Sequence, residues 1–194
     1  RDRLNDARLG KSLAYWVRQL EGAHANVSFP ADRPRPPIRS FRGAREAVEL
    51  NSGLSRRLKQ FCGRCGVTPF MLLLTVLKTL LYRITAQTDI VVGTAFSDRS
   101  VVETEQLVGN MTNTVVLRND LAGRPPFFEL RGRVANSTLD AHEYRDVPFQ
   151  KLVQYVGVDR GLNQNPFFQV MFVLENTPND LLDLGKDLNV EPEW

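Results

Sequence analysis

The amino-acid sequence predicts a fold of the α/β or α+β class, because segments with helical periodicity alternate with short β-branched runs along the chain. Its 194 residues are 42% hydrophobic and 24% charged, and no low-complexity stretch interrupts them. A chain of this composition can bury enough apolar surface to offset its ordering entropy. The length suits one domain or a large part of a bigger one.

The first quarter of the chain is predicted to hold a helix, an extended connector and a strand. One apolar stripe marks a helix over residues 8–20: Leu9, Leu13, Trp16, Val17 and Leu20. Repeated prolines in 29–37 remove backbone donors and favour extended geometry, so we expect an ordered connector; a proline-rich ligand for a partner domain is the alternative. Residues 46–50 alternate as a strand does, and Ser52 is placed to cap the next helix.

The later elements are predicted from caps, prolines and β-branched runs. Thr68 suits an N-cap, and Pro69 suits the first position of a helix whose apolar residues cover most of its circumference, so we expect deep burial. Pro126 and Pro148 open two further helices. Strands are predicted at three segments: 89–93, 111–118 and 167–174.

The charge and cysteine patterns argue against several function classes. Lys and Arg exceed Asp and Glu by 25 − 22 = 3, and the arginines are not interleaved with aromatics, so we interpret them as solvated surface rather than a nucleic-acid site. Cys62 and Cys65 form a lone CGRC pair, with no second Cys/His pair to complete a zinc site. We expect two reduced thiols, which fits a cytoplasmic protein. The apolar run at 70–81 is too short and too polar to span a membrane, and the charged start predicts no signal peptide.

No catalytic constellation is evident from the residues alone. We interpret His24 as a loop residue, and His142 as a surface residue that the helix dipole favours near a helix end. The sequence has no nucleophile-elbow, zinc-protease, P-loop or dinucleotide-binding motif. Polar clusters adjoin the predicted strands at 93–99, 109–114 and 159–166, where α/β proteins often place their sites. Turn-forming residues alone also explain these clusters.

Seven segments resemble, in family order, the signature motifs of nonribosomal peptide synthetase condensation domains. They are SLAYWVRQL (12–20), PADRPRP (30–36), TPFMLLL (68–74), LYRITAQTDIVVGT (81–94), LVGNMTNTVVLR (107–118), YRDVPFQKLV (144–153) and DRGLNQNPFFQVMF (159–172). The matches run from Tyr15 to Phe172, across nearly the whole chain. One such match alone is weak, whereas seven in sequence are specific.

The resemblance implies a chloramphenicol-acetyltransferase-like fold of two αβ lobes around a tunnel, in which this chain forms a mixed sheet flanked by helices. It implies a partial condensation domain over 1–194, with an opening helix and proline-rich connector at 1–45 and an αβ lobe, truncated at its end, at 46–194. The acceptor amine attacks the donor thioester in such a domain and forms a peptide bond. The resemblance therefore implies that the parent protein is an amide-forming acyltransferase. The family's HHxxxDG motif is absent from this sequence, so we expect the isolated fragment to be inactive.

The partners that the resemblance implies are the N-terminal lobe of the same condensation domain, peptidyl carrier proteins and an adenylation domain. No cofactor is expected to bind directly, because the phosphopantetheine arms belong to the carrier proteins. Nucleic acid and membrane are not expected as partners.

The resemblance also implies site residues, position by position. Four residues are candidates to line or support the tunnel: Asn113, Asn165, Thr94 and Gln169. Arg99 or Arg83 is a candidate to pair with the motif aspartate of the absent lobe. No catalytic residue and no metal ligand is expected in this chain. For Asn113 and Asn165 the alternative is that each side chain only bonds nearby backbone.

Three departures from the family pattern bear on the subtype. Ala95 stands where proline is common, Tyr144 stands where histidine is common, and residues 110–112 are more polar than the usual aromatic pair. An epimerization or cyclization lobe is a related alternative, which the first-lobe motif would distinguish from condensation. A non-catalytic platform that docks carrier or adenylation domains is the alternative from another class.

Overall fold

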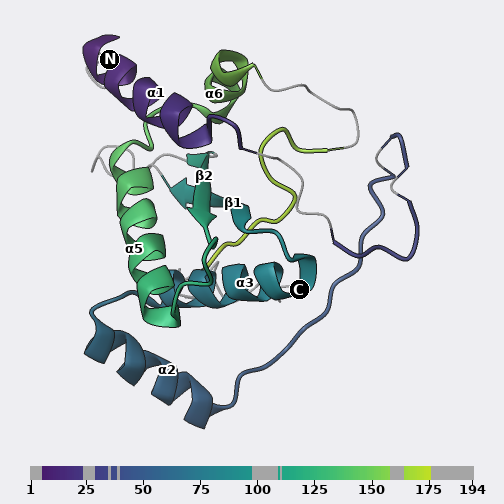
Figure 1. The fold of residues 1–194 in the computed structure, drawn as a ribbon, viewed down its shortest axis with the longest axis vertical. Coiled ribbons are helices and arrows are strands. Elements are labelled where there is room, and N and C mark those ends of the chain that lie inside the picture. Colours follow the sequence, from purple (N-terminus) through teal and green to yellow (C-terminus); the bar gives the residue numbers. More distant parts are fainter. Residues whose placement is uncertain are drawn as a thin grey trace, which may run out of the picture.

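The computed structural model describes residues 6–23, 29–34, 36–38, 40–97, 109, 111–157 and 164–175. Within these ranges it has five helices and two strands (Figure 1): α1 (Asp6–Leu20), α2 (Ser52–Cys65), α3 (Pro69–Thr85), β1 (Asp89–Ser97), β2 (Thr112–Asp120), α5 (Phe127–Glu143) and α6 (Phe149–Val156). The predicted α/β or α+β class is therefore confirmed, although the described helices and strands follow one another in blocks and do not alternate.

The two strands form an antiparallel pair. Their register runs from Asp89 opposite Asp120 at one end to Ser97 opposite Thr112 at the other. Helices α3 and α5 cover one face of this pair, and α1 crosses near β2 and contacts α6 (Figure 1). Buried apolar side chains from strands and helices meet between these layers: Trp16, Leu20, Leu74, Leu81, Ile90, Val92, Val115, Leu117, Leu130 and Val134.

The second edge of β1 is paired at one point. The Gly93 amide donates to the Val170 carbonyl over 2.9 Å, and the Phe172 amide donates to the Gly93 carbonyl over 2.9 Å. The resulting bridge between Gly93 and Met171 is parallel, so the sheet has the mixed character that was predicted. The strand predicted at 167–174 is wrong in extent, because only the backbone around Met171 reaches β1.

A buried lysine joins α3 to the sheet and, through the sheet, to α5. The Lys78 side chain is fully buried, and its Nζ donates to the Leu117 carbonyl over 2.8 Å and to the Asn119 Oδ1 over 2.5 Å. Asn119 Nδ2 in turn donates to the Ser137 hydroxyl of α5 over 3.1 Å. Burial lowers the pKa of Lys78 to about 7, although the Asp89 carboxylate acts in the opposite direction. The hydrogen bonds offset part of the cost of burying this amine.

Arg118 of β2 holds the C-terminal end of α1. It makes a bidentate ion pair with Asp89, with N–O distances of 2.8 and 3.0 Å. Its Nη1 donates to the carbonyls of Gln19 and Glu21 over 3.1 and 2.8 Å. A cation at this position satisfies carbonyls that have no partner within the helix and complements the helix dipole.

Three local predictions are corrected by the structure. Residues 46–50 form no strand, and Val48 is 86% exposed, because no other described strand lies beside this segment to pair with it. The N-cap of α2 is Asn51, whose Oδ1 accepts from the Leu54 amide over 2.9 Å, and Ser52 is the first helical residue. The α3 helix is not buried all round, since Val76, Leu80 and Ile84 are about half exposed. The Thr68 cap and Pro69 are confirmed.

The cysteine prediction is confirmed: Cys62 and Cys65 are both free thiols in the last turn of α2. Burial raises the pKa of the Cys62 thiol, with Cys65 adding to the effect, which disfavours the reactive thiolate.

No single helix among the described residues is long and apolar enough to cross a bilayer; α2 and α3 meet that criterion only together, with a bend of 103° between them.

The buried amine predicts a pH dependence of stability. The folded-state pKa of Lys78, about 7, lies below its ordinary value of 10.5, so the unfolded chain binds more protons between these limits. The free energy of unfolding should therefore rise with pH across this window, while the cost of burial is fully present below it. A Lys78→Met variant should lack this rise. Equilibrium urea unfolding of both proteins across the window measures it, and equal slopes would contradict the assignment.

Candidate functional site

Small side chains gather on one face of the sheet near the Ser97–Thr112 end. Ala95 lies opposite Thr114, and Ser97 lies opposite Thr112. Gly93 is on the same face, because residues two apart in a strand share a face. We call Gly93, Ala95, Ser97, Thr112 and Thr114 the small-residue face; its outer pair, Ser97 and Thr112, is exposed.

Thr94 lies on the opposite, helix-covered face. Phe96, two residues further along the same face, packs against Phe70 of α3 with ring centroids 6.4 Å apart. The Thr94 side chain is 1% exposed, and its hydroxyl has no hydrogen-bond partner among the described residues. This position suits a residue that supports the sheet from behind, and the tunnel-lining role of Thr94 stays a prediction.

Asn113 holds the turn between α5 and α6 against β2. Its Nδ2 donates to the carbonyls of Arg145 and Val147, both over 2.7 Å, and its Oδ1 accepts from the Phe149 amide over 3.3 Å. The alternative that Asn113 bonds backbone is therefore what the structure shows, but that backbone lies 32 to 36 residues away. Asn113 is a tertiary clamp, and its contribution to a tunnel wall stays a prediction.

Asn165 and Gln169 order the segment that joins the edge of β1. Asn165 Oδ1 accepts from the Phe167 amide over 3.2 Å, as in an Asx turn, and Gln169 Nε2 donates to the Asn165 carbonyl over 2.9 Å. Phe168 then lies over Gly93, where a Cβ would be 2.4 Å from the Phe168 Cζ. Only glycine permits this approach.

The Tyr-Trp helix predicted near the start docks on the end of α5. Trp16 is 1% exposed, and its Nε1 donates to the Tyr144 carbonyl over 2.8 Å. Tyr15 stacks on the Tyr144 ring with centroids 4.3 Å apart. Burial, together with Asp140 and Tyr144, raises the pKa of Tyr15 well above its usual value, so this phenol stays neutral. Tyr144, a departure from the family pattern, is thus a packing residue here.

His142 is an exposed residue, as predicted, and it lies beside the end of β1. Its ring meets the Phe96 ring edge-on at 5.6 Å, and Arg145 Nη1 lies 2.9 Å from Nδ1. Burial and then Arg145 lower the pKa of His142, which disfavours the imidazolium form. The predicted helix-dipole effect would act in the opposite direction and does not dominate. Sequence reasoning missed this contact because it depends on the tertiary packing that brings the end of α5 beside Phe96. His24 lies outside the described residues.

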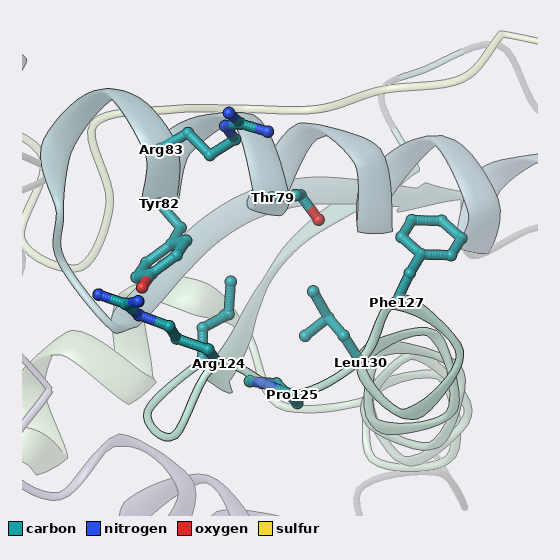
Figure 2. A pocket seen from close by; sticks show the side chains of 8 residues that line it. Thr79, Tyr82, Arg83, Arg124, Pro125, Phe127 and Leu130 are labelled. Atoms are coloured by element: carbon teal, nitrogen blue, oxygen red, sulfur yellow. The ribbon is translucent and has the colours of Figure 1, made fainter.

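The structure places Arg83 away from the Ser97–Thr112 end of the sheet. It belongs to the last turn of α3, near the Asp89 end of β1, and lines a cavity with Tyr82 and Arg124 (Figure 2). At about 3.3 Å per residue, the two ends of β1 are roughly 26 Å apart. Arg99 lies outside the described residues. Pairing of either arginine with a motif aspartate stays a prediction.

The arrangement supplies amide, hydroxyl and aromatic groups but no nucleophile paired with a base in the part of the chain that is described. No group of three or more His, Cys, Asp or Glu side chains there could hold a metal ion. What the geometry offers is a sheet end of small side chains, framed by turns that Asn113 and Asn165 order. Such a surface can shape a substrate passage, while proton transfer requires a group from elsewhere.

Comparisons with known proteins identify relatives of the whole chain. A family profile described as Condensation domain matches residues 1–191. A linear gramicidin synthase of Brevibacillus parabrevis is 42% identical over 178 residues, which are 92% of this chain and 4% of that relative. Malpibaldin synthetase of Mortierella alpina is 37% identical over 190 residues, 98% of this chain and 3% of that relative. The chain thus spans a few per cent of these relatives' length.

Solved structures share the fold. The X-domain from teicoplanin biosynthesis is 30% identical with a TM-score of 0.81, covering 88% of this chain and 38% of that chain. The complex of this X-domain and OxyB gives the same identity and TM-score, covering 88% of this chain and 37% of that chain. A four-domain nonribosomal peptide synthetase bound to AMP and glycine has a TM-score of 0.83 at 21% identity, covering 87% of this chain and 13% of that chain. The last likeness concerns the fold alone.

Asn113→Ala should destabilise the chain by about 2–3 kcal/mol, because two donated hydrogen bonds and one accepted bond are lost. Asn113→Asp should cost at least as much, since its carboxylate faces two carbonyl oxygens. Asn136→Ala, at an exposed position of α5, is the control and should change stability by less than about 0.5 kcal/mol. Urea unfolding measures all three; an Asn113→Asp variant as stable as the parent would rule out the clamp.

Gly93→Ala should destabilise the chain by about 1–3 kcal/mol, because the new methyl group overlaps the Phe168 ring. The amide of Phe172, which donates to Gly93, should also exchange its hydrogen faster. Gly132→Ala in α5 is the matched control: no atom lies within 4 Å of its Cβ position, so a neutral or slightly stabilising effect is expected. Equal behaviour of the two variants in thermal unfolding and hydrogen exchange would contradict the close contact.

Proposed function

This chain belongs to the condensation-domain family, and from that premise we propose that it supplies one lobe of a domain that forms peptide bonds between carrier-bound substrates. The acceptor amine attacks the carbonyl carbon of the donor thioester, the C–S bond breaks, and the phosphopantetheine thiol leaves. The nitrogen loses its proton to a base, and an amide remains. The chain is thus part of an amide-forming acyltransferase.

One observation carries this proposal: segments that resemble separate family motifs are joined by direct contacts. Trp16 bonds the carbonyl of Tyr144, and Asn113 bonds the backbone of the turn that follows Tyr144. On the other edge of the sheet, the segment that begins at Asn165 pairs with Gly93. A sequence resemblance without function would not require that motifs far apart in the chain frame one sheet end.

The chain's own residues serve as wall and support in this proposal. Ala95 and Thr114 offer low steric bulk beside a passing substrate arm, and Asn165 and Gln169 order the neighbouring segment. Asn113 supports this wall indirectly, because its side chain holds the turn after α5 against β2. None of these side chains is a proton-accepting base. In this proposal the imidazole that accepts the proton comes from the first lobe, whose paired-histidine motif this sequence does not contain.

The proposal extends to partners and location. The N-terminal lobe completes the tunnel, peptidyl carrier proteins deliver both substrates on phosphopantetheine arms, and an adenylation domain loads the carriers. The multidomain relatives support this context, since this chain matches 4% or less of the two synthetases compared above. The phosphopantetheine is bound to the carriers and not to this chain. We expect the whole protein in the cytoplasm.

A second candidate function is docking of a partner protein without catalysis. It is favoured by the likeness to the X-domain, which is 30% identical and was solved in complex with OxyB. The two candidates differ in the parent protein, because a docking platform binds its partner but forms no amide. An epimerization or cyclization lobe is a further alternative that the first-lobe motif would distinguish.

The isolated chain, mixed with donor and acceptor substrates on carrier proteins, should give no condensed product, since it has no proton-accepting histidine of its own in the tunnel. The complete condensation domain with the same carriers should give product, detectable by mass spectrometry of the acceptor carrier. Product from the isolated chain would overturn the two-lobe account. An intact domain that binds the carriers yet makes no amide would favour the docking platform.

A further inference from the structure

A cavity of about 370 Å³ lies between the C-terminal half of α3 and the segment that joins β2 to α5. Leu121 and Leu130, which are 2% and 3% exposed, line it together with Pro125 and Phe127, so much of its wall is apolar. A cavity of about 150 Å³ is enough to bind benzene, so this one can hold an apolar group of roughly a dozen non-hydrogen atoms. Its size is that of a small-molecule site.

The elements around the cavity are held together by hydrogen bonds. Lys78 of α3 donates to Asn119 near the end of β2, and Asn119 donates to Ser137 of α5. Arg133 of α5 also donates, over 2.8 Å, to the carbonyl of Asp120. Because these bonds fix α3, β2 and α5 relative to one another, the cavity is preformed, and a ligand does not have to order its walls.

One cation lies opposite the apolar part of this lining. Figure 2 shows the side chains of Tyr82 and Arg124 pointing toward one another, while Phe127 and Leu130 lie on the α5 side. Arg83 extends along the other side of the α3 ribbon in this view. Arg124 is therefore the guanidinium placed to meet a ligand whose apolar part fills the cavity.

Within the described ranges, no ion pair joins Arg124 to a carboxylate. The acidic residues nearest to it in sequence have other partners: Asp120 accepts from the Ala122 amide over 2.8 Å, and Glu129 pairs with Arg133. A guanidinium offers parallel N–H donors that match a carboxylate in a bidentate pair. An apolar cavity beside such a group is complementary to a ligand that is apolar over most of its length and carries a carboxylate at one end.

The backbone of Arg124 is in a disfavoured conformation. Its φ is +51°, in the left-handed region that residues other than glycine rarely adopt, and it follows Gly123 at +76°. Glycine or asparagine would adopt this conformation at lower cost. An arginine kept at a strained position is consistent with a function of its side chain.

We propose that this cavity binds a small apolar carboxylate. The carboxylate accepts two parallel N–H bonds from Arg124, and the apolar part packs on Leu121, Phe127 and Leu130. Leu121 is bonded to the Thr88 carbonyl, which places the cavity at the Asp89 end of β1, away from the candidate site. It is therefore a second site, and the proposal does not rest on amide formation.

Isothermal titration of the complete condensation domain with sodium decanoate tests the proposal. Binding should saturate at one decanoate per domain. Decan-1-ol has the same chain without the charge and should bind roughly tenfold more weakly, and decyltrimethylammonium, with the opposite charge, should not bind. In a domain with labelled leucine methyl groups, nuclear Overhauser effects should connect the decanoate chain to Leu121 and Leu130.

Substitutions of Arg124 separate recognition from folding. Arg124→Gln should weaken decanoate binding by roughly tenfold and leave decan-1-ol binding unchanged. Arg124→Asn should weaken decanoate binding as much while thermal stability stays equal or rises, because asparagine tolerates the left-handed backbone. Arg57→Gln, at an exposed position of α2, is the matched control and should change neither affinity.

Four outcomes would overturn the proposal: no saturable binding of decanoate, equal affinity for decanoate and decan-1-ol, a bound chain that contacts neither Leu121 nor Leu130, or an affinity that survives both Arg124 substitutions. The readout is binding alone. A domain that forms no amide would therefore contradict the proposed function and leave this test intact.

Discussion

The Phe168 ring occupies the space that any side chain on residue 93 would need, and this single contact determines how the last described segment joins the sheet. With glycine there, the backbone around Met171 comes close enough to bond both polar groups of Gly93. The Asx turn at Asn165 and the bond from Gln169 to the Asn165 carbonyl lie in the segment that this junction places beside β1. A methyl group in the middle of β1 would therefore disturb this junction through the Phe168 ring.

On the other face of the sheet, the main constraint is that buried polar groups need hydrogen-bond partners. Side chains there are enclosed by α3 and α5, and polar groups persist only where they find partners, as Lys78 does on Leu117 and Asn119. The Thr94 hydroxyl departs from this rule among the described residues. One strand thus separates a buried layer, in which Lys78 is hydrogen-bonded and the Thr94 hydroxyl has no described partner, from a face of small side chains at its outer end.

Local signals made the helices and the two main strands predictable, since Thr68 and Pro69 fix the start of α3 whatever surrounds it. The strand at 46–50 failed because alternation is necessary but not sufficient, and a strand also requires a neighbour. The site was only partly predictable. The sequence pointed to Asn113 and Asn165. It did not predict that Asn113 bonds a turn 32 to 36 residues away, because that bond depends on tertiary contact. It also did not predict the face on which Thr94 lies, because the strand register determines that face.

The indole of Trp16 bonds a carbonyl 128 residues further along the chain, and Arg118 reaches the same helix across 97 to 99 residues. During synthesis, α1 leaves the ribosome long before either partner exists. Its apolar side, with Trp16 and Leu20, must wait in contact with water or a chaperone until α5 has been translated. At 5–20 residues per second this delay is on the order of ten seconds, which makes the first helix one of the last elements to reach its native place.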